Sequence, residues 1–396
     1  MCTFRSGISK AVNPRKAVRE CLSTAEIESL GTPDLILVHT TLGHNFEAML
    51  SELQQAAPGA LVAGCTGSGV IGRGWVSEAM RAMALMTVSG VDISIATVDA
   101  ISADNSADLA QRCAQELRDQ NSEISMIMLM GPGLDVDGDA LVDGVEAVFG
   151  TSIPIMGALG GFGGTAPRTP VFYNDQIITH GLILIGIAAP GLELVQISHH
   201  GSLPQPDQFT VTKAEGVRVD ELDGKPAWPT LMSNLGLSET TQPVEIINLL
   251  GLGLDLNEAD QQEYDNEKIL RAPLILDENG SSCYFQTSIP EGSVLTACQR
   301  EEEYLLQGAQ RMIERLKQKL NGRKPLAVLQ SDCMGRGRLA HNVVEKDVFI
   351  RDMQLGLTSD MSLPWLGVYG FAEYAMLGGR NRHHNYTTTL SVLVEE

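Results

Sequence analysis

The chain has 396 residues, of which 43% are hydrophobic, and its 49 acidic and 28 basic side chains give a net charge of −21. A chain this long exceeds one ordinary core, so we expect two domains that fold without disulfides or structural metals. The strong negative charge opposes binding to nucleic acid or to an anionic membrane surface. These two function classes are therefore excluded at the outset.

The cysteines and the N-terminus indicate a cytoplasmic protein. The seven cysteines are scattered and include no CxxC pair, which argues against a disulfide framework and against a structural zinc site. The first 16 residues, MCTFRSGISKAVNPRK, lack the apolar core of a signal peptide. The most apolar run, 182–190, is too short to span a bilayer.

In chain order, a polar N-terminal segment with a predicted helix at 14–30 comes first. One module is then predicted three times. Each copy has a buried strand, a helix, a second strand, a glycine-rich or polar loop and a last strand. The first copy comprises 34–40, 46–53, 60–65, 64–74 and 81–88. The second comprises 125–130, 139–149, 153–158, 159–165 and 181–188, after a strand at 93–98 and a helix at 106–118. The third comprises 325–330, 342–353, 365–374, 378–385 and 387–394.

A different region separates the second and third copies. Hairpins are predicted at 209–219 and 274–287, with turns at Glu215-Gly216 and around Asn279-Gly280, followed by a strand at 293–298. The helix at 301–320 has the clearest apolar stripe in the chain.

The best domain boundary is the polar, proline-containing stretch 198–207, which divides the chain into domains 1–200 and 201–396. His199 and His200 are then expected to be polar linker residues. The predicted class is α/β to α+β, with mixed sheets, repeated strand-helix-strand-loop-strand modules and flanking helices. If the three copies are one structural repeat, their loops form equivalent rims.

Enzyme templates give little support for catalysis. The chain has no GxGxxG opening a helix, no P-loop, no HExxH and no GxSxG. Cys65 and Cys333 each stand at a predicted strand end where a nucleophile could lie. A small buried cysteine is the commoner outcome at such positions, so we expect no enzymatic activity.

Two polar clusters of the third module are the strongest candidates for a binding site. One follows strand 325–330 and contains Arg336, Arg338, His341 and Asn342; the other is the loop Arg380, Asn381, Arg382, His383, His384 and Asn385. When two parallel strands are connected by a helix, their carboxyl ends lie at the same edge of the sheet. The two clusters are therefore expected to face each other. Arginines there suit a carboxylate-bearing ligand. The alternative is a set of solvated loops.

Many short segments in a fixed order resemble the FIST domains, a sensory module of bacterial signal transduction proteins. The resemblance to the first FIST domain is carried by DLILVHT, LVAGCTGSG, MLMGPGLDVDGDALVDGV and IPIMGALGGFGG. The resemblance to the second is carried by VTKAEGVRVDELDGKPA, IPEGSVL, SDCMGRG, GVYGFAEY and HNYTTTLSVLV. The chain departs from the family at the turn Cys65-Thr66-Gly67-Ser68 and at Ala372, where the family usually has glycine before Glu373.

The resemblance implies ligand sensing with output through another protein. The stand-alone type is similar to the nitric-oxide-sensing NosP haemoproteins, which implies non-covalent haem b, nitric oxide as the sensed gas and a separate histidine kinase as partner. His384 is then the first choice of axial iron ligand, before His383 and His341. The implied cofactor-binding set also includes Arg380, Arg336, Asn385, Glu373 and Tyr369. A homodimer is compatible with this reading.

Two alternatives stay open. One is a sensor without haem that holds a carboxylate or amino-acid-like metabolite through Arg336, Arg380 and Asn385. The other is an enzyme with Cys65 or Cys333 as nucleophile.

Overall fold

The computed structural model describes residues 2–26, 31–163, 167–247, 249–340 and 343–396. One structural unit occurs three times in it, as the sequence predicts. Each unit runs strand, helix, strand, helix, strand, then a two-stranded hairpin and a last strand.

The elements of the three units correspond one to one. The first unit comprises β1 (Thr3–Ser9), α1 (Pro14–Thr24), β2 (Leu35–Thr40), α2 (Phe46–Ala56), β3 (Leu61–Thr66), β4 (Gly69–Gly72), β5 (Trp75–Ser77) and β6 (Met83–Ser89). The second comprises β7 (Asp92–Val98), α3 (Ser106–Gln120), β8 (Met126–Gly131), α4 (Gly138–Phe149), β9 (Ile155–Leu159), β10 (Val171–Tyr173), β11 (Gln176–Ile178) and β12 (Leu182–Ala188). The third comprises β13 (Leu192–His200), α8 (Glu302–Leu320), β22 (Pro325–Cys333), α9 (Val343–Leu357), β23 (Trp365–Gly370), β24 (Ala372–Leu377), β25 (Arg380–His384) and β26 (Thr387–Glu395).

Each unit donates its hairpin to the sheet of another unit. The β4–β5 hairpin pairs with β23, β10–β11 pairs with β3, and β24–β25 pairs with β9. The result is three six-stranded sheets, each with one parallel pair at its centre: β2 with β3, β8 with β9, and β22 with β23. The N-terminal and C-terminal halves of the chain therefore complete each other's sheets.

Three equivalent backbone hydrogen bonds join the units in a ring. Each bond starts at a backbone N one or two positions after the second parallel strand of one unit. It ends on a carbonyl at or next to the end of the corresponding strand in another unit. They run from Gly161 N to Thr66 O (2.9 Å), from Ser68 N to Tyr369 O (2.9 Å) and from Phe371 N to Leu159 O (3.0 Å). Two of the loops predicted as equivalent rims, 64–74 and 159–165, take part in this ring, whereas the third unit contributes Tyr369 and Phe371 at the end of β23 instead of the predicted loop 378–385.

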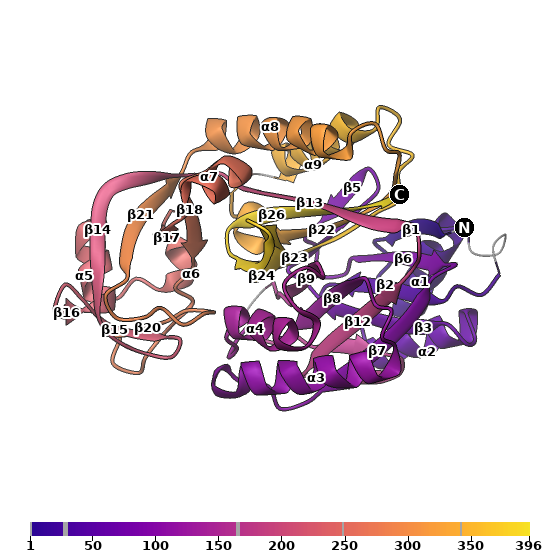
Figure 1. Ribbon diagram of the computed structural model, residues 1–396, viewed down its shortest axis with the longest axis horizontal. Helices are drawn as coiled ribbons and strands as arrows, with labels where there is room; N and C mark the ends of the chain where they lie inside the picture. Colours follow the sequence, from indigo (N-terminus) through magenta and orange to yellow (C-terminus); the bar gives the residue numbers. More distant parts are fainter. Residues whose placement is uncertain (1, 27–30, 164–166, 248, 341–342) are drawn as a thin grey trace.

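The inner faces of the sheets share one core, and helix pairs cover the outer faces. Leu37, Met128 and Leu329, which occupy equivalent positions on β2, β8 and β22, are buried in that core. Helices α1 and α2 cover the first sheet, α3 and α4 the second, and α8 and α9 the third (Figure 1). No helix in the described part of the chain has both the length and the apolar content of a bilayer span.

A separate lobe of residues 202–300 is inserted between β13 and α8 (Figure 1, left). It has its own core around the buried Trp228. Its elements are β14 (Ser202–Glu215), β15 (Arg218–Leu222), β16 (Lys225–Pro226), α5 (Ala227–Asn234), α6 (Pro243–Ile246), β17 (Gly251–Asp255), α7 (Glu258–Tyr264), β18 (Lys268–Arg271), β19 (Ile275–Leu276), β20 (Cys283–Tyr284) and β21 (Val294–Arg300). Both predicted hairpins of this region are present.

Some local predictions are wrong because distant strands supply the pairing. His199 and His200, expected in a linker, are buried in β13 and pair with Thr388 and Thr387 of β26. The loop expected at 378–385 is a tight hairpin turn followed by strand β25. The glycine loop expected at 64–74 contains strand β4, the first strand of the β4–β5 hairpin. Strand β1 lies in the stretch read as a polar lead. The helix expected at 14–30 ends at Thr24, and residues 27–30 lie outside the described residues.

We predict that Gly64→Ala lowers the free energy of unfolding by about 3 kcal/mol, since overpacking in a filled core is destabilising. Gly64, Gly157 and Gly367 occupy the same position on β3, β9 and β23. A methyl group at Gly64 would lie 1.8 Å from the Val38 carbonyl oxygen. Urea unfolding followed by circular dichroism measures the change.

The matched control is Gly131→Ala at the end of β8. There the nearest atoms to an added methyl are side-chain carbons of Leu159 and Leu182, at 3.2 and 3.5 Å, which can shift. The Gly131→Ala variant should lose less than about 1 kcal/mol of unfolding free energy. Equal losses in the two variants would contradict the close strand packing described here.

Candidate functional site

A cluster of buried polar side chains lies where the inserted lobe meets the third unit. We call it the buried polar cluster. Its members come from the lobe and from strands β22 to β26 and the turn after β22: Tyr264, Arg300, Asp332, Arg336, Tyr369, Glu373, His384 and Thr387. The end of β22 and the hairpin β24–β25 bring most of these groups together, and the lobe closes over them.

One side of the cluster is a chain of hydrogen bonds from the lobe to the hairpin. The Tyr264 hydroxyl lies 3.2 Å from Nδ1 of His384 and 2.8 Å from the Thr387 hydroxyl. The Thr387 backbone N donates to Oε2 of Glu373 at 3.3 Å. Because Tyr264 belongs to α7, this chain connects the lobe directly to the strand that carries His384.

The other side is a buried ion pair. Nε of Arg336 donates to Oδ1 of Asp332 at 2.9 Å, and each side chain is 1% exposed. Gln330 donates to the second oxygen of Asp332 at 2.9 Å. The Arg336 guanidinium also lies over the ring of Phe349 on α9, 5.9 Å from its centroid. Removing one partner of such a pair is expected to be strongly destabilising.

Burial shifts the protonation equilibria of the cluster toward neutral forms. Desolvation, reinforced by the nearby Asp332, raises the pKa of Glu373 well above its usual range. Desolvation also raises the pKa of Asp332 in spite of Arg336. The pKa of His384 falls to about 3, through desolvation first and then through Arg271. A neutral imidazole and a protonated Glu373 are therefore favoured near neutral pH.

Several charged groups of the cluster have unused hydrogen-bonding atoms. Within the described residues, both terminal nitrogens of Arg336, one of Arg300, Oε1 of Glu373 and the Tyr369 hydroxyl make no hydrogen bond. Each such buried atom is unfavourable by about 1–3 kcal/mol, and native proteins rarely leave them unpaired. Donors and an acceptor are thus both available to a ligand.

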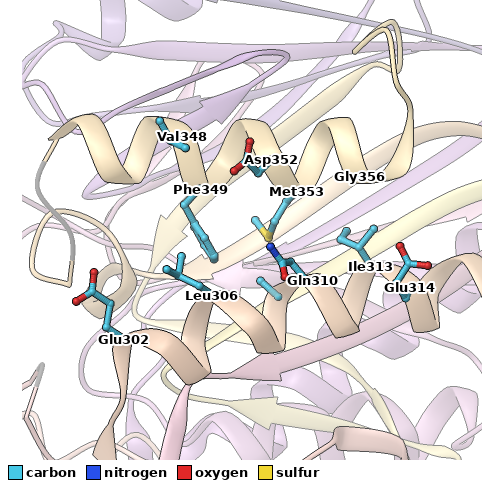
Figure 2. Close-up of a pocket in the computed structure, with 11 residues that line it drawn as sticks. Glu302, Leu306, Gln310, Ile313, Glu314, Val348, Phe349, Asp352, Met353 and Gly356 are labelled. Atoms are coloured by element: carbon cyan, nitrogen blue, oxygen red, sulfur yellow. The ribbon is translucent and has the colours of Figure 1, made fainter.

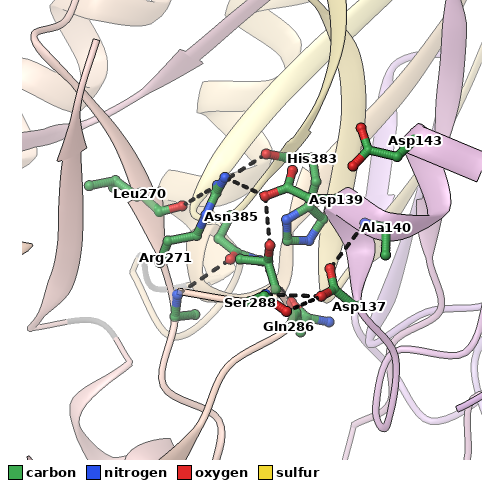
Figure 3. A network of polar contacts seen from close by, with 12 residues as sticks. Asp137, Asp139, Ala140, Asp143, Leu270, Arg271, Gln286, Ser288, His383 and Asn385 are labelled. Carbon is green, nitrogen blue, oxygen red and sulfur yellow. Dashed lines mark hydrogen bonds and ion pairs between the residues drawn. The ribbon is translucent and has the colours of Figure 1, made fainter. Parts of the chain in front are cut away.

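A second polar network fastens the lobe to the N-terminal end of α4 (Figure 3). Arg271 donates to Asp139 at 2.9 Å and to the His383 carbonyl at 3.1 Å. Ser288 donates to Asp137, which also caps α4. Asn385 donates to Gln286 at 2.8 Å. Asn385 thus holds the lobe to the body of the molecule.

The candidate residues from the sequence occupy three kinds of position. Arg336, Tyr369, Glu373, His383, His384 and Asn385 are buried at this boundary. Arg380 is 45% exposed and forms ion pairs with Asp143 and Glu146 of α4, outside the cluster. His341 lies outside the described residues. Tyr264, Arg300 and Asp332 were not singled out, because no local pattern separates them from other polar residues.

His383 is enclosed rather than facing a cavity. Neither ring nitrogen makes a hydrogen bond within the described residues, and desolvation lowers its pKa to about 3. Its ring lies so close to Gly138 that an added methyl there would be 2.4 Å from Cδ2. Across the described ranges, no group of three His, Cys, Asp or Glu side chains is arranged to hold a metal ion.

The two candidate nucleophiles are in unreactive surroundings. Sγ of Cys65 lies 3.3 Å from Nδ1 of His39, a neighbour that the sequence did not reveal because it sits on the adjacent parallel strand. Burial raises the pKa of Cys65 to about 12 and lowers that of His39 to about 4. Cys333 is buried and its pKa is raised by desolvation and then by Glu373. Reactive thiolates need exposed, electropositive sites.

Comparison with known proteins agrees with the motifs. Residues 34–225 match the FIST N domain, and residues 231–376 match the FIST C domain. The chain is a FIST domain protein. FIST domains are sensor domains of signal transduction proteins. The junction between the two matched ranges falls within the inserted lobe.

The FIST relatives found are uncharacterized. One, from Mycobacterium bovis, is 24% identical over 408 residues that cover 99% of this chain and 100% of the relative. Another, from Mycobacterium tuberculosis, is 23% identical over 401 residues that cover 98% of this chain and 99% of the relative.

Among solved structures, a cyanuric acid hydrolase from A. caulinodans has a TM-score of 0.40 at 7% identity, with 100% of both chains covered. A chorismatase has a TM-score of 0.35 at 11% identity, covering 100% of this chain and 98% of its own. These scores are too low to carry a functional argument.

The attachment of the lobe predicts a pH effect on stability. Burial alone would raise the pKa of Asp139, but Arg271, His383 and Thr287 outweigh it and lower the pKa to about 2. The folded-state pKa lies below the unfolded value of about 3.9, so this stabilisation is present above about pH 4 and is lost as the pH falls toward 2. Because the Asp139 side chain is 39% exposed, screening reduces the effect to about 1 kcal/mol.

We therefore expect Asp139→Asn to lower the unfolding free energy by about 1 kcal/mol near pH 6, with the difference from wild type shrinking toward pH 3. Urea unfolding of both proteins at several pH values checks this. Glu116→Gln, at an exposed position on the neighbouring helix α3, is the control and should follow the wild type. A difference that stays constant with pH would refute the assignment to Asp139.

Proposed function

We propose that this FIST protein is a cytoplasmic, non-enzymatic sensor of a small carboxylate or amino-acid-like metabolite, bound in the buried polar cluster, and that it signals to a separate histidine kinase. The observation that carries the proposal is the set of unpaired donors on Arg336 beside the unpaired Oε1 of Glu373. A guanidinium fork pairs bidentately with a carboxylate. The Glu373 carboxyl group suits an ammonium or hydroxyl group of the same ligand.

The boundary between the lobe and the body supplies a way for ligand binding to be reported. Only two crossings, β13 to β14 and β21 to α8, join the lobe to the rest of the chain. A cleft of about 550 Å³ runs along the boundary between lobe and body, with Asp135 on one side and Gln286 on the other. A ligand that pairs with groups from both parts favours the closed arrangement, since it binds that state better.

Haem b is the second candidate, and the residues around His384 do not fit it well. A neutral imidazole is the correct species for an axial ligand, and Nε2 of His384 makes no hydrogen bond within the described residues. A porphyrin also needs a wide, flat apolar cavity. His384 is instead flanked by Tyr264, and His383 and Arg271 lie close by. An apolar cavity of about 360 Å³ lies between α8 and α9, and neither histidine lines it. A nitric oxide response would depend on haem.

The ligand proposal predicts calorimetric binding of one member of a panel of amino acids and small carboxylates. Glu373→Met, which keeps a similar side-chain volume but removes both carboxyl oxygens, should weaken that binding at least about tenfold, because a hydrogen bond to a charged ligand group contributes about 1.5–3 kcal/mol. Arg380→Ala, which removes the ion pairs with Asp143 and Glu146 outside the cluster, should leave the affinity unchanged. Absence of binding to every member of the panel, with a folded protein, would count against this ligand class.

The haem reading is tested by the visible absorption spectrum of protein expressed with a haem precursor. From the packing around His384 we expect no Soret band at stoichiometric intensity, before or after added haemin. A band near one haem per chain that shifts on reduction and with nitric oxide, and that changes in His384→Ala, would replace the metabolite proposal with the gas-sensor reading.

A further inference from the structure

The parallel helices α8 and α9 form an apolar groove on the surface of the molecule (Figure 2). Its volume is about 360 Å³. Phe349 and Met353 project from α9 toward α8, and Leu306 and Ile313 project from α8 (Figure 2). Most of the floor is buried, but Leu306 is 39% exposed and Val348 is 49% exposed. An apolar stripe therefore remains open to solvent.

This opening is not required by the fold, because the equivalent helix pair of the second unit is closed. There Gly144 of α4 lies so near α3 that an added methyl would be 2.4 Å from the Ala107 carbonyl oxygen. In the third unit, close approach occurs at Gly356, where an added methyl would be 3.0 Å from Ile313. The groove extends from this contact toward Val348 and Leu306.

The rim of the groove is acidic. Glu302, Glu314 and Asp352 line it, and no lysine or arginine is found among its described lining residues. Of these three, Glu314 also forms an ion pair with Lys317, three residues further along α8, at 3.0 Å. Since the whole chain carries a net charge of −21, a partner surface with apolar side chains flanked by lysine and arginine is the complementary one.

We infer that the groove between α8 and α9 binds an amphipathic, basic α-helix of the signalling partner. The lining residues of α8 run from Glu302 to Glu314, which is roughly 18 Å along a helix axis and matches about three turns of a bound helix. These lining residues recur at helical spacing, so a bound helix can place its own apolar stripe between α8 and α9.

The groove is in physical contact with the buried polar cluster. Phe349 lines the groove, and the guanidinium of Arg336 lies over its ring. Helix α8 also begins two residues after Arg300, at the point where the chain leaves the inserted lobe. A ligand that repositions Arg336 or the lobe therefore changes the groove as well. The identification of the bound helix as part of a signalling partner rests on the proposed function. The binding of a basic helix to the groove does not rest on it.

The test uses the ligand-free full chain and a fluorescein-labelled helical peptide of about 18 residues, long enough to fill the groove, with leucines on one face and lysines beside them. Fluorescence anisotropy should show saturable binding. A peptide of the same pattern with glutamates in place of lysines should bind at least about tenfold more weakly.

Two matched variants locate the binding. Val348→Asp places a charge in the groove and should weaken binding of the basic peptide by at least about tenfold. Leu355→Asp changes a residue of similar exposure (37%) on the same helix, outside the groove lining, and should not. Circular dichroism confirms that both variants are folded.

Other outcomes would overturn either this inference or the proposed function. Absence of peptide binding, equal binding of both peptides, or equal losses in the two variants would show that the groove is not a site for a basic helix. Light scattering that finds a concentration-dependent dimer, abolished by Val348→Asp alone, would assign the groove to a second copy of the chain. Peptide binding without any ligand in the calorimetric panel would leave the groove in place and remove only the proposed metabolite.

Discussion

The exchange of hairpins between the three units is the constraint on which the rest of the structure depends. Each sheet is completed by strands that belong to another unit, and three backbone hydrogen bonds close the exchange into a ring. A backbone N–H or C=O buried at that position without its partner would be unfavourable, so no unit can form its complete sheet alone. Folding of the N-terminal half is thereby coupled to folding of the C-terminal half, in spite of the two separate family matches.

The same exchange places the buried polar cluster. The third unit's hairpin, β24–β25, carries Glu373 and His384 away from β23 and toward the second unit. The inserted lobe, which only the third unit contains, covers that hairpin and adds Tyr264 and Arg300. The other two units have no such cover. The three units thus have similar backbones but different side-chain chemistry, and these polar groups collect at the boundary between the lobe and the body.

Buried charged groups are unfavourable unless they are paired, and for this reason the proposed ligand is assigned to this cluster. Asp332 and Arg336 pair with each other, yet the remaining donors of Arg336 and one oxygen of Glu373 have no partner within the described residues. A ligand that satisfies them stabilises one arrangement of the lobe relative to another. Arg336 also lies over the ring of Phe349. Under the proposed function, a change in the position of Arg336 on ligand binding would therefore alter α9 and the surface beside α8.

The sequence by itself determined the elements whose signal is local. The apolar runs 34–40, 125–130 and 325–330 identified the first parallel strand of each unit, and the order of the elements around them predicted the threefold repeat. It also predicted the class of fold, both hairpins of the lobe, helix α8 and, through its motifs, the FIST family. These succeed because burial periodicity and turn residues act within a few positions of the chain.

Only the tertiary structure decided which strands pair and which polar residues meet. Strands β1, β4 and β25 have weak apolar patterns, and they become strands because a distant partner supplies hydrogen bonds. For the same reason His199 and His200, polar by composition, are buried in a sheet, and His39 lies beside Cys65. Of the candidate residues, Arg336, Glu373 and His384 converge while Arg380 lies at the surface. Convergence depends on contacts between residues more than a hundred positions apart, such as Tyr264 with His384, which no local pattern encodes.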